Sequence, residues 1–185
     1  MYFTLLIICL QAGEEYEKEF QEKYGKEKVS YFRTDVTSHQ NFHDAFEKCR
    51  ELFGKVDILV NSAGIIGENN WETQLQINLF GAIRGTKLAL KYMTKGGIVL
   101  NISSVHGLHV RPTMPTYSAG KSGIITFTRS AGHPIEYADH GIKIICLCPG
   151  AVDTPLGVSV WNFKKVNSEP SCDFIVSLSV NFNAY

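Results

Sequence analysis

The stretch Val56-Asp57-Ile58-Leu59-Val60-Asn61-Ser62-Ala63-Gly64 joins a short apolar run to a polar turn that ends in glycine. A short apolar run is typical of a parallel strand that is buried on both faces, and a longer one stands at Phe3–Cys9. The turn would take the chain off the strand at its carboxyl end. The stretch therefore predicts a strand at 56–60 in a parallel sheet.

The same alternation of strand and helix continues on both sides of this stretch. Further strands are expected at 3–9, 29–33, 97–103 and 143–148. Helices are expected at 13–24, after a cap at Ser38 or Asn41, at 71–93 and from 115 to about 129. Pro134 is expected to end or kink the last of these helices. The order predicts an α/β fold with a Rossmann-like, doubly wound parallel sheet.

The bulk properties exclude several classes of protein. The 185 residues carry a formal net charge of zero and no run of five like charges, which argues against a nucleic-acid partner. The apolar run 1–10 is too short to span a bilayer, which needs about twenty residues, and it lacks the positive start of a signal peptide. No set of histidine and acidic residues has metal-ligand spacing. We expect a cytoplasmic protein with no metal, no nucleic acid and no membrane span.

Tyr117 and Lys121 lie four residues apart in the helix expected from residue 115, so their side chains would share one face. A phenol has an ordinary pKa of about 10 and is a poor base at neutral pH. A neighbouring ammonium would lower that pKa and make Tyr117 a general acid/base. The alternative is a solvated helix face, which a tyrosine and a lysine at this spacing form more often.

Two further polar side chains could complete such a site. Ser104 follows the strand at 97–103, where its hydroxyl could bind a substrate oxygen or could simply stabilise a turn. Asn78 stands inside the helix expected at 71–93, although asparagine is a poor helix former. It is either a surface residue or a polar group directed into the site at a local distortion of the helix.

Five motifs together resemble, in order and spacing, those of the short-chain dehydrogenase/reductase family. They are Asn61–Gly64, Asn78, Ser103–Ser104, the pair Tyr117 and Lys121, and Pro149–Thr154. The resemblance runs from about residue 13 to residue 156. It implies an oxidoreductase that transfers a hydride between a secondary alcohol or ketone and a nicotinamide cofactor.

The resemblance also implies a role for each matched position. Tyr117 would exchange the hydroxyl proton, Lys121 would lower its pKa and hold the nicotinamide ribose, Ser104 would position the reacting oxygen, and Asn78 would anchor a water in the proton relay. Cofactor contacts are implied for Asp35 and Val36 at the adenine, for Asn61, Ala63 and Gly64 beside the adenosine ribose, and for Pro149, Gly150, Val152 and Thr154 at the nicotinamide. NAD is the expected cofactor, and NADP is not excluded because the acidic residue that selects NAD is missing near residues 7–9.

Residues 69–79 and 123–130 resemble the NAD-dependent 15-hydroxyprostaglandin dehydrogenases of this family. This implies oxidation of a secondary alcohol on a lipid, such as a hydroxylated fatty acid or a prostaglandin. Met114 stands where a polar residue that contacts the substrate is expected, which leaves the substrate open.

The sequence departs from the family at both ends. The glycine-rich TGxxxGIG loop, which binds the pyrophosphate at a helix N-terminus, is not found in the 185 residues. The first strand is expected to be missing with it, which would leave the edges of two neighbouring strands unpaired. After Leu156 the match ends, so we expect a partial Rossmann-like domain at 1–156 and a divergent segment at 157–185. The alternating apolar residues of that segment, from Phe174 to Val180, indicate either a strand or irregular structure.

Two functions stay open at this point. The first is an oxidoreductase that binds its cofactor poorly. The second is a catalytically impaired chain that acts only as a binding or dimerisation partner. The helices expected around 75–93 and 118–129 are the surfaces through which family members pair, so a homodimer is possible in either case.

Overall fold

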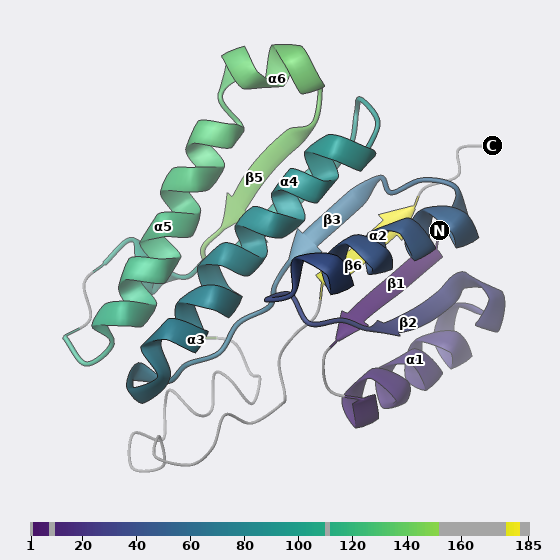
Figure 1. Ribbon diagram of the computed structural model, residues 1–185, viewed down its shortest axis with the longest axis horizontal. Coiled ribbons are helices and arrows are strands. Elements are labelled where there is room, and N and C mark those ends of the chain that lie inside the picture. The colour runs from purple at the N-terminus through teal and green to yellow at the C-terminus, as the bar shows by residue number, and fades with distance from the viewer. Residues whose placement is uncertain (1, 8–9, 110–111, 152–176, 182–185) are drawn as a thin grey trace.

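The computed structural model describes residues 2–7, 10–109, 112–151 and 177–181. A six-stranded sheet with the strand order β2-β1-β6-β3-β4-β5 organises these residues (Figure 1). The strands are β1 (Tyr2–Ile7), β2 (Val29–Arg33), β3 (Ile58–Asn61), β4 (Ile98–Ile102), β5 (Lys143–Leu147) and β6 (Ser177–Asn181). The pairs β1–β2, β3–β4 and β4–β5 are parallel, as predicted.

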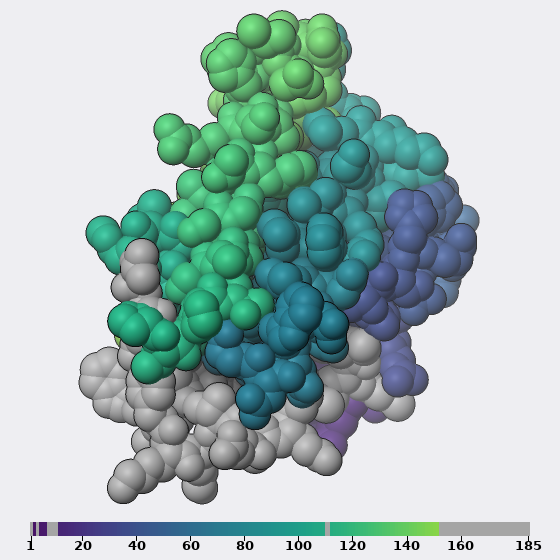
Figure 2. Space-filling view, turned by 60° about the vertical axis from the view of Figure 1, so that its left-hand side comes forward, coloured from purple at the N-terminus to yellow at the C-terminus, as the bar shows by residue number. Residues whose placement is uncertain are grey.

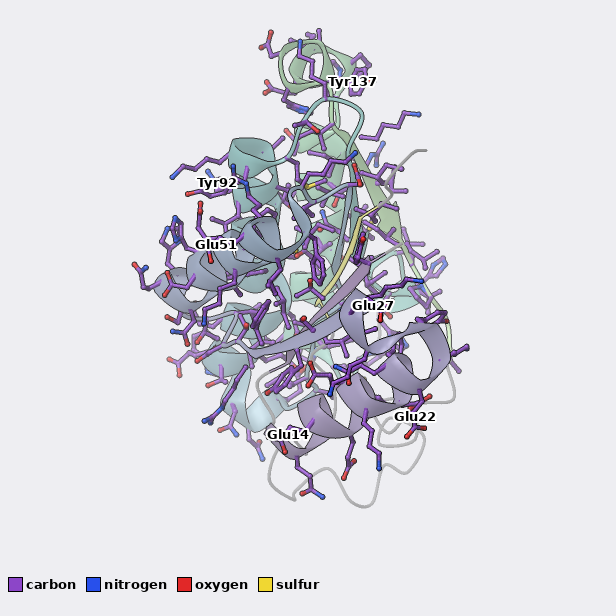
Figure 3. All side chains as sticks on the ribbon, turned by 90° about the vertical axis from the view of Figure 1, so that its right-hand side faces the viewer. Glu14, Glu22, Glu27, Glu51, Tyr92 and Tyr137 are labelled. Carbon is purple, nitrogen blue, oxygen red and sulfur yellow. The ribbon has the colours of Figure 1, made fainter. Side chains whose placement is uncertain are left out.

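Helices cover both faces of the sheet. They are α1 (Leu10–Tyr24), α2 (His39–Phe53), α3 (Trp71–Leu75), a π-helical segment (Gln76–Gly81), α4 (Ala82–Tyr92), α5 (Pro115–Ala131) and α6 (Pro134–His140). One face carries α2, α4 and α5, and the opposite face carries α1 (Figures 1 and 3). The exposed Glu14 and Glu22 of α1 project away from the sheet (Figure 3). The doubly wound arrangement is confirmed.

β6 lies between β1 and β3 and runs antiparallel to both. The sequence predicts a parallel sheet with unpaired edges at this place, and that prediction is wrong. Val180 is the partner of Phe3 on one side and of Ile58 on the other, so both edges are filled. Segment 157–185 therefore contributes a strand, at 177–181, to the same sheet. In the doubly wound order 3-2-1-4-5-6 this central place belongs to the first strand.

The helix α2 shows why the apolar residues fix the core. Ser38 caps it, because its hydroxyl accepts a bond of 3.3 Å from the Asn41 backbone N–H, and Asn41 is thus inside the helix. Its buried residues are Phe42, Ala45, Phe46 and Cys49, which follow helical spacing. They pack in one core cluster with Leu6 of β1, Leu59 of β3, Val99 of β4 and Leu88 and Ala89 of α4.

The long helix predicted at 71–93 is interrupted around Asn78. Residues Gln76–Gly81 form a π-helical segment between α3 and α4, and Asn78 is only 1% exposed. A π turn adds one residue to a helical turn and is common at functional sites. The predicted local distortion is confirmed, and the alternative of a surface asparagine is wrong.

A buried polar network ties the sheet to two helices. The Asn61 side-chain amide of β3 donates to the Asn101 side chain of β4 at 2.8 Å and to the Ala82 carbonyl at 3.3 Å. The Asn101 amide donates in turn to the Thr128 hydroxyl of α5 at 2.9 Å, and the Thr86 hydroxyl of α4 donates to Asn101 at 3.3 Å. Buried polar groups are tolerated when they are paired in this way. The network fixes β3 and β4 against α4 and α5.

Element ends differ from the predicted ones by a few residues. β3 begins at Ile58 where the sequence predicts Val56, and α1 begins at Leu10 where it predicts Gly13. Pro134 does end the preceding helix, as predicted: α5 stops at Ala131, and Pro134 begins α6, where its missing N–H has no cost. Within the described ranges, no helix is long and apolar enough to cross a membrane.

We expect Val180→Pro to destabilise the chain, because proline removes a backbone donor from a strand that pairs on both sides and leaves a neighbouring acceptor unsatisfied. The free energy of unfolding in urea, followed by circular dichroism, should fall by about 2 kcal/mol or more. Val180→Thr, which keeps the backbone N–H and a β-branched side chain, is the matched control. Equal stabilities for the two variants would contradict the central position of β6.

Candidate active site

Lys121 joins α5 to the end of β4 by two reciprocal bonds. Its ammonium Nζ donates to the Ile102 carbonyl at 3.0 Å, and its own carbonyl accepts a bond of 2.7 Å from the Ser103 hydroxyl. Lys121 is 4% exposed. The cation is therefore held below the surface at the carboxyl end of β4, where doubly wound folds bind ligands.

Tyr117 lies one helical turn before Lys121 on the same buried face. The Lys121 Nζ is 5.6 Å from the centre of the Tyr117 ring, and Tyr117 is 6% exposed. Ser104 is also buried, and its hydroxyl, which accepts from the His106 N–H at 3.2 Å, lies close enough to the Tyr117 phenol to act to lower its pKa. The structure thus brings Tyr117, Lys121 and Ser104 together, and the alternative of a solvated helix face is wrong.

Burial sets the ionisation of both titratable groups. It lowers the pKa of Lys121 from 10.5 to about 8, with Cys146 and Cys148 acting in the opposite direction. It raises the pKa of Tyr117 above its ordinary value, and the hydrogen bond with Ser104 only partly opposes this. The sequence predicts a lowered pKa for the phenol. That prediction is wrong for the chain as described, because the loss of solvation outweighs the hydrogen bond.

Asn78 reaches the same region from the π-helical segment. Its side-chain oxygen accepts from the Ile65 N–H and its amide donates to the Ile65 carbonyl, both at 2.8 Å. A methyl group on Gly64 would lie 3.6 Å from the Asn78 oxygen and 3.7 Å from the Lys121 ammonium nitrogen. Asn78 and Lys121 therefore face each other across Gly64. The water relay through Asn78 stays a prediction.

The residues that are predicted to contact the adenosine lie together at the ends of β2 and β3. Val36, Asn61 and Ala63 line one small cavity with Phe42, Gly81 and Ala82. One carboxylate oxygen of Asp35 is bonded within the chain: it accepts from the Thr37 N–H at 2.8 Å and from the Thr37 hydroxyl at 2.7 Å. Their contacts with a cofactor stay predictions, and the Asn61 amide is occupied by the buried network.

The loop after β5 reaches the site through backbone bonds. The Pro149 carbonyl accepts from the Val105 N–H at 2.9 Å, next to Ser104, while Gly150 is exposed. Val152 and Thr154, which the sequence predicts at the nicotinamide, lie outside the described residues. Pro149 is thus held next to Ser104, and the contacts of Pro149 and Gly150 with a nicotinamide stay predictions.

The short chain dehydrogenase family model matches residues 4–165. The chain belongs to the short chain dehydrogenase family. It is 42% identical to the 15-hydroxyprostaglandin dehydrogenase [NAD(+)] of Bos taurus over 156 residues, which cover 82% of this chain and 59% of that one. It is 39% identical to alcohol dehydrogenase 1 of Ceratitis cosyra over 158 residues, which cover 83% of this chain and 62% of that one.

Solved structures agree with this family assignment. The crystal structure of levodione reductase superposes with a TM-score of 0.80 and 26% identity, covering 89% of this chain and 67% of that one. The chain spans about three fifths of the length of the curated dehydrogenases that it matches.

The sequence does not predict the part that the Glu68 carboxylate plays in this site. Glu68, in the 3₁₀ turn Glu68–Asn70, accepts bonds from the backbone N–H groups of Thr116 and Tyr117 at 3.1 and 3.0 Å. The partners are 48 and 49 positions apart in the chain, and no local pattern encodes such a contact. Gln74 is fully buried and accepts from the Gly67 N–H at 2.9 Å, and the sequence does not predict this contact either.

A pocket of about 370 Å³ lies beside the cluster of Tyr117, Lys121 and Ser104. It is on the side of α5 that carries Ser118 and Ser122. His106 and His109 line it. His106 also packs edge-on against Tyr117, with ring centres 6.1 Å apart. Among the residues that the structure describes, no group of three histidine, cysteine or acidic side chains could hold a metal ion.

We expect Lys121→Met to lose stability relative to the wild type as the pH rises from about 7 to about 9.5. Below pH 8 the folded wild type keeps a buried charge, whereas between pH 8 and 10.5 it releases a proton that the unfolded chain retains. The wild type alone is therefore stabilised as the pH rises. The free energy of unfolding of the wild type, less that of Lys121→Met, should rise by about 2 kcal/mol from pH 7 to 9.5.

Urea unfolding at the two pH values measures this difference. Lys87→Met, which removes an exposed lysine of α4, is the matched control and should give the same difference at both. A pH-independent difference for Lys121→Met would mean that the ammonium is not buried in the folded chain.

Proposed function

We propose that this chain is a nicotinamide-dependent oxidoreductase that interconverts a secondary alcohol and a ketone, with Tyr117 as the acid/base. The observation that carries the proposal is the buried cluster of a phenol, a serine hydroxyl and an ammonium at the carboxyl end of β4. Membership of the short chain dehydrogenase family and the names of the curated relatives support the same reaction class.

The nicotinamide end of the site fits a cofactor. An ammonium carries three N–H donors, and the Ile102 carbonyl takes one of those of the buried Lys121. The others can bind the ribose hydroxyls, while Pro149 and Gly150 border the place of the nicotinamide. The bound cofactor would accept or supply the hydride. NAD is the proposed cofactor, on the name of the bovine relative, and NADP is not excluded.

The pyrophosphate end fits less well. In a doubly wound fold, the loop after the carboxyl end of the central strand binds the pyrophosphate at a helix N-terminus. β6 fills the central place in the opposite direction, so its first residue, Ser177, lies beside Asn61 at the cofactor edge. A loop after the carboxyl end of β6 would emerge at the other edge. The chain should therefore hold the nicotinamide half of the cofactor better than the pyrophosphate.

The protein groups would move the proton as follows. The Ser104 hydroxyl orients the substrate oxygen, and Tyr117 exchanges a proton with it. Because burial raises the pKa of Tyr117, the phenol is protonated at neutral pH and is ready to donate to a ketone. Oxidation of an alcohol requires the phenolate, which a charged Lys121 beside the ring would stabilise.

The substrate proposed is a secondary alcohol on a lipid, such as a hydroxylated fatty acid or a prostaglandin. The name of the bovine relative and the resemblance of residues 69–79 support this choice. Met114, the buried residue that precedes α5, stands three positions before Tyr117 and is apolar. A cytoplasmic location and a homodimer stay predictions.

We expect Tyr117→Phe to lower turnover at least 100-fold, because a positioned acid/base contributes about 10²–10⁴ in rate. Reduced cofactor is followed at 340 nm with millimolar NAD and a panel of secondary alcohols that includes hydroxylated fatty acids. Tyr137→Phe, at an exposed tyrosine of α6, is the control and should keep full turnover. Undiminished turnover by Tyr117→Phe would overturn the proposed role of the phenol.

We expect weak cofactor binding, with a dissociation constant of hundreds of micromolar. The lost pyrophosphate bonds are worth about 1.5–3 kcal/mol each, so even two of them lower the affinity by about 100-fold or more. Titration of the purified chain with NADH and NADPH, followed by fluorescence, measures the affinity and compares the two cofactors. A dissociation constant near 1 micromolar would contradict this expectation.

The direction of β6 also favours a second candidate function, that of a catalytically impaired binding or dimerisation partner. No binding at millimolar NADH or NADPH, together with a dimer in light scattering, would support this second function. Measurable turnover with any secondary alcohol would exclude it.

A further inference from the structure

The first turn of α5 has no local cap. Pro115 is its first residue and has no N–H to satisfy, and the preceding Met114 makes no side-chain bond to the helix. The Ser118 N–H makes the first bond within the helix, to the Met114 carbonyl at 3.0 Å. The N–H groups of Thr116 and Tyr117 are therefore the two donors that need a partner from outside.

Glu68 supplies both partners. One of its carboxylate oxygens accepts from the Thr116 N–H at 3.1 Å and the other from the Tyr117 N–H at 3.0 Å. A carboxylate at a helix N-terminus also interacts favourably with the helix dipole. Burial acts to raise the pKa of Glu68, but the bonds from Tyr117 and Thr116 outweigh it and leave the pKa below its ordinary value. The carboxylate is thus ionised at neutral pH.

Glu68 is itself fixed on the opposite side. The preceding Gly67 donates its N–H to the buried Gln74 of α3, and Ile65 is bonded at both backbone groups to Asn78. Segment 65–68 is therefore anchored to α3 and to the π-helical segment. α3 and α5 lie side by side (Figures 1 and 2). One carboxylate joins the helix that carries Tyr117 to the element that carries Asn78.

We propose that Glu68 is a positioning residue, which holds the first turn of α5 and so sets the place of Tyr117 relative to Asn78. It contacts the backbone of Tyr117 and acts on the reaction through that residue. Its effect on catalysis rests on the proposed function, whereas its effect on the helix does not. Loss of the carboxylate should loosen the first turn of α5 and leave the rest of the helix, held by Lys121 and Thr128, in place.

Amide hydrogen exchange tests the cap without any cofactor or substrate. In Glu68→Ala, the amides of Thr116 and Tyr117 should exchange about tenfold faster, as expected for the loss of a helix cap. The amides of the second half of α5 and of the middle of α2 should be unchanged. Glu72→Ala, which removes an exposed carboxylate from α3, is the matched control. Unchanged exchange at Thr116 and Tyr117 would overturn the proposal whatever the activity.

Titration of the Tyr117 phenol separates positioning from charge. The tyrosinate absorbance of each variant, less that of the same variant with Tyr117→Phe, isolates this phenol among the eight tyrosines. Glu68→Ala should move its titration to lower pH, because a looser turn admits water to the buried ring. Glu68→Gln, which removes the charge but keeps one acceptor, should move it less. An equal shift in both variants would assign the effect to charge alone and overturn the positioning role.

Kinetics give the last readout. Glu68→Ala should lower kcat about tenfold and leave the KM for the alcohol within about twofold, since the misplaced phenol affects the proton transfer rather than substrate binding. A change in KM alone would contradict the proposal. If Tyr117→Phe has full turnover, the proposed function fails, while the exchange experiment still decides the role of Glu68.

Discussion

The reciprocal pair of bonds between Lys121 and the end of β4 is the constraint on which the site depends. The ammonium binds the Ile102 carbonyl while the Lys121 carbonyl binds the Ser103 hydroxyl, so side chain and backbone of one residue dock α5 onto one strand end. Rotation of α5 would break both bonds at once. Tyr117, one turn earlier, and Ser104, one residue after Ser103, are therefore brought to the same place by a single docking event. Burial of the ammonium is the cost of this docking, and it is visible in the lowered pKa of Lys121.

The sequence predicts those features that depend on neighbours in the chain. The strand at Val29–Arg33, the Ser38 cap, the end of α5 before Pro134 and the distortion at Asn78 are all decided by residues within a turn or two. The family motifs extend this to the cluster around Tyr117, because their spacing carries information about contacts between distant elements. The sequence does not predict contacts between distant elements when no family motif marks them. Glu68 meets α5 across 48 positions, and β6 pairs with β1 and β3 across most of the chain. The sequence also does not predict the raised pKa of Tyr117, because that pKa is set by burial, which depends on how the site is packed.

Asn61 shows that a matched motif position can serve the fold before it serves a ligand. Its amide donates to Asn101 and to the Ala82 carbonyl, and a methyl on Gly85 would collide with its side chain. The close approach of α4 to β3 thus needs a glycine at one position and a buried amide at the other. The Asn61 amide nitrogen is thus used by the fold, and a contact of this residue with a cofactor stays a prediction. The same is true of Ser103, whose hydroxyl is used on Lys121, whereas the neighbouring Ser104 turns its hydroxyl to Tyr117.

β6 separates two tasks that one central strand performs in a doubly wound fold. The first task is to pair with both neighbours, and this needs only a strand with free backbone groups and suitable side chains, in either direction. The second is to deliver a phosphate-binding loop at the carboxyl edge of the sheet, and this depends on direction. An antiparallel strand performs the first task and cannot perform the second. The core and the cluster at Tyr117 therefore depend on the pairing of this strand, whereas the weak cofactor binding that we propose depends on its direction.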